Sequence, residues 1–493
     1  DSPNILAWET DGTGTGGQSW YDLSLGVATN DENLVYVGGV NIWKSVNGGI
    51  DWSIEASSGS GNYAYMHVDQ HALEFNPINN TLYAGNDGGF YKYLDNLNTW
   101  TDISDGLEIS QFYRLGLSKS NRNILVSGAQ DNGTERLSSS GWDAIRGADG
   151  MECIIDPFDP DIIYSSSQYG NIKVTYNGGN NWNNIKPVSY DGAWVTPYKM
   201  HPLNNYFIIA GYDEVYRTTT GGAFWDSISI NLTTKTAIRT IALAPSDIDV
   251  IYVATYSKLS VTFDGGNSWT NIKPGLPSST ISDVTVSAND PNWVFVTFSN
   301  YNSGNKVYES TDGGNSWTNI SGSNLPNLPV NCIVYQDLTN DDLYIGTDVG
   351  VYHKDNTMSD WQAFMSGFPN VIVDELEIHY GSGKIRAATF GRGIWESNLQ
   401  SQPNGIANNY MSYVSTYPNP AVDYFILNVP ENVISKNPVL NIYNLTGQLV
   451  LSKNIKSANQ FVDVSNLKSG YYIYELGAVG IRNVRSKLIV LPN

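Results

Sequence analysis

The sequence predicts an all-β protein, in which a large β-propeller is followed by a small immunoglobulin-like β-sandwich. A Gly-Gly-x-x-Trp element recurs with a mean step of about 44 residues, which is the length of one four-stranded propeller blade. Alternating apolar and polar residues fill the intervals, and no window of ten or more residues between Trp20 and Trp395 keeps a helical period. After Asn398 the repeat stops and another strand-like pattern begins.

The composition limits the kinds of partner that this protein can have. Charged residues make up 15% of the chain and the formal net charge is −21. Nucleic acids and anionic lipid surfaces attract basic proteins, so neither is expected as a partner. No apolar stretch is long enough to cross a membrane. The sequence starts at Asp1 without a basic and apolar leader, so we expect that a signal peptide or a longer upstream segment has been removed or was not included.

Each repeat reads as one blade of four strands. An apolar strand is followed by a Pro/Asp turn, a second strand rich in Val, Ile and Tyr, a short loop, a third strand, the Gly-Gly turn and a fourth strand that opens on Trp. The clear copies of the element occupy residues 45–52, 175–182, 218–225, 262–269 and 310–317, and weaker copies end at Trp100, Trp142 and Trp361.

The Gly-Gly turn can satisfy its own hydrogen bonds. In the copy at residues 262–269, Gly265 and Gly266 can adopt the positive φ angles that tight hairpins require. Asp264 and Thr262 can accept backbone N–H groups across the turn. The indole of Trp269 is expected to lie beneath the turn or against the neighbouring strand. The sequence therefore predicts a structural fastener rather than an active site.

This element resembles the Asp-box, Ser/Thr-x-Asp-x-Gly-x-x-Trp, of sialidases, sortilin-type receptors and xyloglucanase-type propellers. Asn47, Asn177 and Thr220 stand at the aspartate position in three copies, and a catalytic carboxylate would not tolerate such replacements. The resemblance implies that the boxes lie on the side of the propeller opposite to any catalytic face.

The two ends of the repeat region suggest how the ring closes. Residues 13–20 form a further box-like turn, whereas residues 373–399 supply three strands with no box after them. We therefore expect the N-terminal segment to provide the missing outer strand of a single ring of eight or nine blades, spanning residues 1–399. In the alternative, the chain is the C-terminal part of a longer double-propeller protein. Sortilin-like propellers also exceed eight blades.

Residues 410–493 follow a polar linker at 400–409 and resemble a known export domain. They are similar to the type A C-terminal sorting domain of the bacterial type IX secretion system. The resemblance implies export across the outer membrane of a Gram-negative bacterium, with the secretion machinery as a partner and the mature protein secreted or held at the cell surface. The matching residues include Tyr417, Pro418, Asn419, Pro420, Gly447, Gly470 and Lys487.

Polar and aromatic residues gather in the loops opposite the boxes. In a propeller, the loops between the second and third strands and those between blades share one face, so these side chains are expected to meet at a common rim. The candidates for binding are His67, Asp69, His71, Gln130, Trp194, Tyr198, Asp348 and Arg392, and the carboxyl groups considered for catalysis are Asp87, Asp131, Asp149 and Glu152.

Three interpretations of this rim remain open. The aspartates can simply cap turns. The rim can bind a glycan or a protein, with Trp194 and Tyr198 as stacking platforms, as in a cell-surface adhesion module; this is the function we predict. The alternative is a polysaccharide-active glycoside hydrolase that uses a carboxyl pair. Neither the arginine set of sialidases nor the N-terminal catalytic loop of xyloglucanases is present, although Asp348 lies in a similar "TDVG" stretch.

No cofactor is indicated by the sequence. His67, Asp69 and His71 alternate along one strand face and could in principle ligate Zn²⁺, but a hydrogen-bonded loop cluster is favoured and no metal site is predicted. Nothing in the sequence points to bound calcium either. The two cysteines, Cys153 and Cys332, lie in distant repeats and are expected to be buried thiols without a disulfide.

Overall fold

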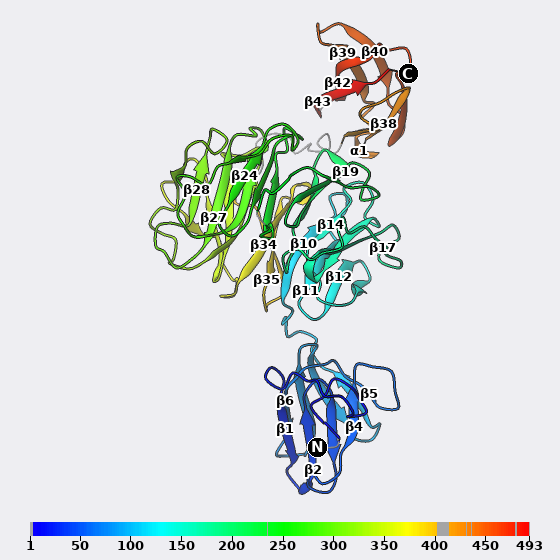
Figure 1. Cartoon of the computed structure of the whole chain (residues 1–493), viewed down its shortest axis with the longest axis vertical. Coiled ribbons are helices and arrows are strands. Elements are labelled where there is room, and N and C mark those ends of the chain that lie inside the picture. The colour runs from blue at the N-terminus through cyan, green and yellow to red at the C-terminus, as the bar shows by residue number, and fades with distance from the viewer. Residues whose placement is uncertain are drawn as a thin grey trace. The chain divides into compact units, whose positions relative to one another are not determined.

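The computed structural model describes residues 3–233, 235–401, 414–429, 431–434, 436–478 and 481–492. The chain divides into two compact units, Asp1–Ser110 and Gln111–Asn493, and Figure 1 shows their sheets along the chain. Apart from Gln400 and Ser401, the predicted linker lies outside the described residues. No helix of the described part is long and apolar enough to cross a membrane.

The first unit contains two sheets built from consecutive strands. Buried side chains of Tyr36, Leu82, Tyr93 and Trp100 form the core between them. The strands of the two sheets are β1 (Ser24–Ala28), β2 (Asp31–Gly38), β3 (Ile42–Ser45), β4 (Ser53–Ser57) and β5 (Ala64–Tyr65), then β6 (Gln70–Phe75), β7 (Leu82–Asn86), β8 (Gly89–Leu94) and β9 (Thr99–Asp102).

The second unit contains seven propeller sheets, within the residues described. Six of them have four antiparallel strands in sequence order, and the seventh has three. The first three blades are β10 (Phe112–Leu117), β11 (Leu125–Ala129), β12 (Gly133–Ser138) and β13 (Gly141–Arg146); β14 (Cys153–Ile155), β15 (Ile163–Ser167), β16 (Asn171–Thr175) and β17 (Asn183–Asn184); and β18 (Tyr198–His201), β19 (Asn204–Gly211), β20 (Val215–Thr218) and β21 (Asp226–Ser227).

The remaining blades repeat the same order of strands. Two short 3-10 turns, η1 (Gln168–Gly170) and η2 (Tyr380–Ser382), interrupt the loops. The strands of these blades are β22 (Thr240–Leu243), β23 (Ile251–Ala254), β24 (Leu259–Thr262) and β25 (Thr270–Asn271); β26 (Thr280–Val286), β27 (Val294–Ser299), β28 (Val307–Ser310) and β29 (Thr318–Asn319); β30 (Val330–Gln336), β31 (Asp342–Thr347), β32 (Gly350–Lys354) and β33 (Gln362–Ala363); and β34 (Val373–His379), β35 (Lys384–Thr389) and β36 (Ile394–Asn398).

The seven blades close into a ring. Each pair of neighbouring blades shares an apolar cluster, and the seventh blade packs on the first through Ala388, Phe112 and Leu115. Figure 1 shows β34 and β35 beside β10, although they are more than 250 residues apart in the chain. The backbone N–H of Leu115 donates to Glu375 Oε2 at 2.6 Å across this seam. The first strands of successive blades therefore lie around a common axis.

The sheets are grouped differently from the single ring of eight or nine blades that the sequence predicted. Nine sheets precede residue 399, as expected, but seven of them close on one another in the second unit and two belong to the first. The last sheet of the ring has three strands among the described residues. Complementary apolar faces, which strand patterns do not reveal, decide which blades join.

At four junctions of the ring, a box tryptophan fastens a blade to the one before it. The indole Nε1 atoms of Trp182, Trp269, Trp317 and Trp361 each donate to a main-chain carbonyl of the preceding blade, at 2.8–3.0 Å. The accepting residues are Ile145, Ile228, Ile272 and Ile320, which follow the fourth strand or end it. The predicted indole packing against a neighbouring strand is thus observed between blades.

The box glycines have the conformation that the sequence predicts. Gly265 and Gly266 have φ angles of 69° and 97°. Thr262 Oγ1 accepts the N–H of Gly266 at 2.9 Å, and Asp264 accepts from Ser268 and Thr262. Hydrogen bonds from the Ser268 side chain and backbone lower the pKa of Asp264 to about 2. The turn satisfies its own polar groups, as expected of a structural element.

The C-terminal domain is a two-layer β-sandwich. Its core includes Phe425, Leu440, Tyr474 and Leu488. One sheet has the order β37 (Ser415–Tyr417), β38 (Tyr424–Asn428), β41 (Asn459–Asp463), and the other has β40 (Leu449–Asn454), β39 (Val439–Asn444), β42 (Gly470–Ala478), β43 (Ile481–Val490); α1 (Glu431–Ile434) follows β38.

Several residues of the export signature hold this sandwich together. Asn419 donates to the carbonyl of Lys487 at 2.8 Å and accepts the N–H of Ile489 at 2.9 Å. These two hydrogen bonds attach the Pro-Asn-Pro segment to the last strand, β43. Gly447 occupies the predicted hairpin turn with a φ of 82°. Cys153 and Cys332, both in the propeller, are free and buried, as predicted.

We predict that Gly314→Ala destabilises the ring more than Gly304→Ala. Both glycines have positive φ, so both replacements strain the backbone. A Cβ on Gly314 would lie 2.6 Å from Ile272 Cδ1 of the preceding blade, whereas one on Gly304 would meet nothing within 4 Å. Overpacking should cost Gly314→Ala about 1–3 kcal/mol beyond the control. Urea unfolding measures the difference, and equal losses would contradict the fastening role of the box.

The seam between the first and last blades gives a pH-dependent prediction. Burial raises the pKa of Asp374 to about 6, against the opposing charge of Arg114. Since the folded state favours the protonated acid, the free energy of unfolding should fall as the pH rises from about 4 to 6. A shift of two pK units corresponds to about 3 kcal/mol at most. Asp374→Asn should make this decline shallower, because it removes one of the buried carboxyl groups whose pKa is raised.

Asp264→Asn is the matched control for the seam, because the pKa of Asp264 is lowered instead. A carboxyl group with a lowered pKa adds stability that is lost only in strong acid. Between pH 4.5 and 7 the control should therefore follow the wild-type profile. An Asp374→Asn profile that also follows the wild type would show that Asp374 does not contribute to the fall in the free energy of unfolding.

Candidate functional site

The loops opposite the boxes in the second unit form one face of the ring, here called the mouth. Because the strands are antiparallel and run in sequence order, the loops from second to third strand and those between blades emerge on the same side. The mouth therefore receives Gln130 from the β11–β12 loop, Tyr169 from η1 and Trp194 from the β17–β18 loop. The boxes emerge on the other side, as the resemblance implied.

Trp194 is held against the first blade by hydrogen bonding. Its indole Nε1 donates to the hydroxyl of Tyr113 at 3.2 Å, and that hydroxyl donates to Gln130 Oε1. The ring of Tyr113 also packs on Phe390 of the last blade, with 5.4 Å between ring centroids. Three elements far apart in the sequence thus meet at one place, and two predicted residues, Gln130 and Trp194, lie in contact with the same tyrosine.

Tyr169 adds a second exposed ring beside Trp194. The two rings meet edge to face with centroids 5.2 Å apart, and the N–H of Tyr169 donates to the carbonyl of Trp194 at 3.1 Å. Tyr169 has a φ of 59°, an uncommon conformation for an aromatic residue. Tyr169 is 43% exposed and Trp194 38%, so both rings present area to solvent.

Asp149 maintains the shape of these loops. Its Oδ1 accepts the backbone N–H of Asp131 at 2.6 Å, and its other oxygen accepts from the side chain of Gln168. Asp131 has a φ of 59°, and Asp149 is only 8% exposed. The Asp149 carboxylate therefore contacts the backbone of Asp131, and it has the turn-capping role that was one of the open interpretations.

Glu152 lies in the central channel rather than at the mouth. It is 2% exposed and contacts Lys199 Nζ at 3.1 Å and Arg114 Nε at 3.5 Å. Lys199 also contacts Glu375 at 3.2 Å. Burial raises the pKa of Glu152 although two cations lie beside it. A cavity of about 410 Å³ inside the ring is lined by these charged groups.

The structure does not support a stacking role for Tyr198. Its ring is fully buried between two blades, and its hydroxyl donates to the carbonyl of Glu152 at 2.7 Å. The residue follows the loop that carries Trp194, but it begins strand β18, whose side chain here faces the core. Asp348 accepts from Asn331 at 3.0 Å, and Arg392 is exposed with its guanidinium donating to the carbonyl of Gly391.

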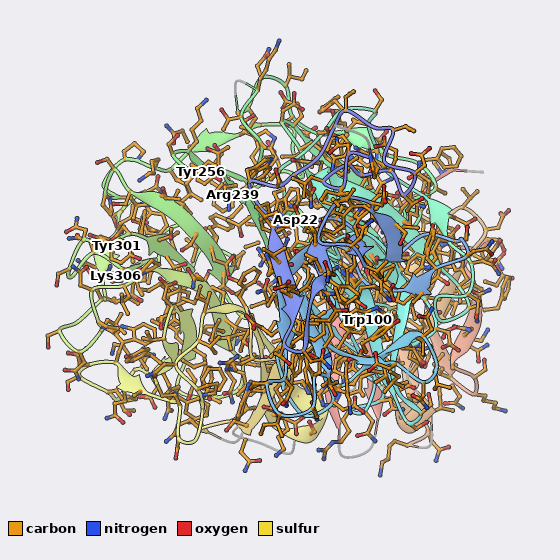
Figure 2. The ribbon with its side chains drawn as sticks, turned by 90° about the horizontal axis from the view of Figure 1, so that it is seen from below. Asp22, Trp100, Arg239, Tyr256, Tyr301 and Lys306 are labelled. Carbon is orange, nitrogen blue, oxygen red and sulfur yellow. The ribbon has the colours of Figure 1, made fainter. Side chains whose placement is uncertain are left out.

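The mouth also contains residues that the sequence did not single out. The guanidinium of Arg239 lies 4.1 Å from the ring centroid of Tyr256, and Figure 2 shows the two side by side. Tyr169 and Phe390 were missed as well. All four stand in inter-strand or inter-blade loops, so loop position combined with an aromatic or arginine side chain is the signal that would have found them.

The first unit holds the other predicted residues in a separate cluster. His71 Nε2 lies 2.8 Å from Asp87 Oδ1, and the hydroxyl of Tyr21 donates to the same carboxylate at 2.7 Å. Asp69 accepts from the amide of Gln18 at 2.5 Å.

The remaining predicted histidine contacts a main-chain carbonyl. His67 Nδ1 is 3.2 Å from the carbonyl of Val68. Gln18 also donates to the buried Asp22, labelled in Figure 2, whose pKa is raised by burial. In the described part of the chain, no three His, Cys, Asp or Glu residues are grouped to hold a metal ion. The contacts are those of a hydrogen-bonded loop cluster.

Two protein-family models match the chain. The model for the secretion system C-terminal sorting domain covers residues 415–491. The model described as sortilin, neurotensin receptor 3 covers residues 213–324, within the ring of the second unit. The sorting domain shows that the protein is exported through the type IX secretion system, to the cell surface or the extracellular space.

Similar proteins include a glycan-active enzyme in each of two comparisons. An ulvan lyase of Nonlabens ulvanivorans is 31% identical over 100 residues, which are 20% of this chain and 18% of the lyase. The crystal structure of a GH74 xyloglucanase from Xanthomonas campestris aligns with a TM-score of 0.51 at 16% identity, over 76% of this chain and 59% of the enzyme. This chain therefore covers less than two thirds of either relative.

A third similar structure is YCF48 from Cyanidioschyzon merolae, with a TM-score of 0.46 and 11% identity over 59% of this chain and 95% of that one. The xyloglucanase likeness indicates the fold alone, and it agrees with the ring of sheets described above. The chain is thus a β-propeller protein with Asp-box-like turns, in which residues 213–324 match the sortilin model and residues 415–491 form a type IX secretion sorting domain.

Proposed function

We propose that this exported propeller is a glycan-binding module of the cell surface, and that the mouth of the second unit binds the sugar. The observation that carries the proposal is the pair of exposed rings, Trp194 and Tyr169, held edge to face by a network of hydrogen bonds. Flat aromatic rings bury the apolar faces of sugars, and polar groups beside them bind the hydroxyls. Gln130 and Arg239 supply such polar groups from neighbouring loops.

The rigidity of the two rings favours binding. A side chain that is already fixed loses little conformational entropy when a ligand arrives. Trp194 is fixed by Tyr113, and the backbone of Tyr169 is fixed by the loop of Trp194, since Gly192 also donates to the carbonyl of Tyr169 at 3.2 Å. The two rings are therefore already in position for a ligand, and no loop has to close over the mouth.

The carboxyl groups near the rings favour binding over hydrolysis. Glycoside hydrolases generally use two carboxyl groups about 5–9.5 Å apart, one of which transfers a proton to or from the substrate. Asp149 is buried and accepts two hydrogen bonds from its own loops, and Glu152 is paired with Lys199 and Arg114 inside the channel. Both groups therefore already have structural partners.

The charge of the protein narrows the glycan class. With a net charge of −21, long-range repulsion opposes a polyanionic chain, so neutral polysaccharides are the preferred ligands. Xyloglucan is a suitable neutral probe, since a xyloglucanase shares the fold, and ulvan is suitable as a second probe because of the lyase relative. The proposal expects stronger retention by neutral glucans.

We predict that Trp194→Ala lowers the affinity for the bound polysaccharide at least tenfold, which is about 1.4 kcal/mol. Affinity electrophoresis of the full chain in gels containing each polysaccharide gives the comparison. Phe224→Ala is the matched control, because Phe224 is 79% exposed but stands on a box turn at the opposite end of its blade. The control should keep wild-type retention.

Two results would overturn this proposal. Retention that Trp194→Ala leaves unchanged would show that the mouth is not the binding site. Release of new reducing or unsaturated ends from a polysaccharide by the wild-type chain would make the protein an enzyme, as in the alternative interpretation.

A further inference from the structure

The last blade of the ring has an open edge. Its sheet consists of β34, β35 and β36, whereas each of the other six blades in the second unit has a fourth strand, as far as the structure describes the chain. The outer side of β36 is not paired with any described strand. Such an edge presents N–H and C=O groups that can pair with an added strand.

The junction between the sixth and seventh blades also lacks its indole. At four other junctions, a tryptophan of the later blade donates to an isoleucine carbonyl of the earlier one. Phe364, three residues after Trp361, occupies the position of those isoleucines in the sixth blade, but the seventh blade contributes no box tryptophan. The four observed hydrogen bonds from an indole to a carbonyl therefore indicate that a tryptophan side chain is missing at this junction in the described part of the chain.

A cavity lies where the indole would be expected. Its volume is about 420 Å³, and the fourth strand of the sixth blade and β36 of the seventh both line it. Apolar side chains form much of the wall, among them Phe364, Phe368 and Trp395. Arg386 and Glu396, which form a 2.7 Å ion pair, add a polar border.

The junction between the seventh and first blades also lacks a partner strand among the described residues. Trp142, the box-position tryptophan of the first blade, is 46% exposed, whereas Trp361 of the sixth blade is fully buried. Trp142 stacks on Phe112 of its own blade at 5.9 Å. By the order of the ring, the partner of Trp142 would be the outer strand of the seventh blade. One missing strand therefore accounts for both the cavity and the exposed indole.

We propose that the seventh blade is a docking site for an extended strand of another polypeptide, with the pattern aromatic-x-x-aliphatic. The aromatic side chain fills the cavity beside Phe364, as Trp317 packs beside Ile272 in the fifth blade. The aliphatic residue three positions later covers Trp142. Main-chain hydrogen bonds to β36 complete the sheet, which is the strand-addition mode of peptide recognition.

The spacing in this pattern follows from the chain itself. In the complete blades the tryptophan and the isoleucine that accepts the next indole are three residues apart, as in Trp269 and Ile272 or Trp317 and Ile320. Residues 16–23 have a similar sequence, Gly-Gly-Gln-Ser-Trp-Tyr-Asp-Leu, although they do not form a box turn. Trp20 is 87% exposed, so a second copy of this chain is the competing donor.

The test uses the full chain and a fluorescein-labelled peptide with the sequence of residues 310–320, Ser-Thr-Asp-Gly-Gly-Asn-Ser-Trp-Thr-Asn-Ile. Fluorescence anisotropy should show saturable binding, and the same peptide with alanine in place of tryptophan should bind at least tenfold more weakly. Ser397→Trp, which fills the cavity from β36, should abolish binding. Ser303→Trp, on an exposed loop of the fifth blade, should leave it unchanged.

The results of this test distinguish peptide binding at the seventh blade from self-association of the chain and from glycan binding at the mouth. Absence of saturable peptide binding would overturn the proposal, as would binding that Ser397→Trp leaves intact. Concentration-dependent self-association, measured by light scattering and removed by Trp20→Ala, would assign the edge to a second copy and overturn a foreign partner. Trp194→Ala should keep peptide binding and Ser397→Trp should keep glycan retention, so this proposal and the proposed function fail independently.

Discussion

The bond from a box indole to the carbonyl of the preceding blade is the interaction on which the ring depends. Each blade is a small sheet with two apolar faces, and it is stable only when both faces are covered. The indole joins the outer strands of two blades, while the second box glycine leaves room for the isoleucine of the earlier blade. A side chain on that glycine would separate the blades, so the Gly-Gly-x-x-Trp spacing encodes contact between blades as well as a turn.

The same interaction explains where function can reside. Since the boxes are used for fastening on one face, the loops of the opposite face are available to carry a binding site. Tyr169 and Trp194 from these loops meet each other, and Trp194 also contacts Tyr113 of β10 in another blade. The central channel is lined by ion pairs among Arg114, Glu152 and Lys199, which connect the inner strands to one another. The mouth is exposed, aromatic and polar, whereas the channel is buried and charged.

The sequence placed only part of the candidate site, because loop positions in a repeat can be counted but contacts between blades cannot. Gln130, Asp149 and Trp194 do lie on the expected face. Tyr198 was misplaced because one residue decides whether a side chain at the start of a strand points outward or into the core. The rings of Tyr169 and Phe390 were missed since they contact partners from other blades, and no local pattern records such contacts.

The sequence by itself determined the strands, the box turns, the absence of a disulfide and the export domain, because each depends on short-range spacing of glycine, tryptophan and alternating apolar residues. Only the tertiary structure decided how the nine sheets are grouped and which blade remains open. Closure depends on whether the last and first blades present matching apolar faces, as Ala388 and Leu115 do. These residues are far apart in the chain, and the free energy of their contact depends on the curvature accumulated over all seven blades rather than on any one segment.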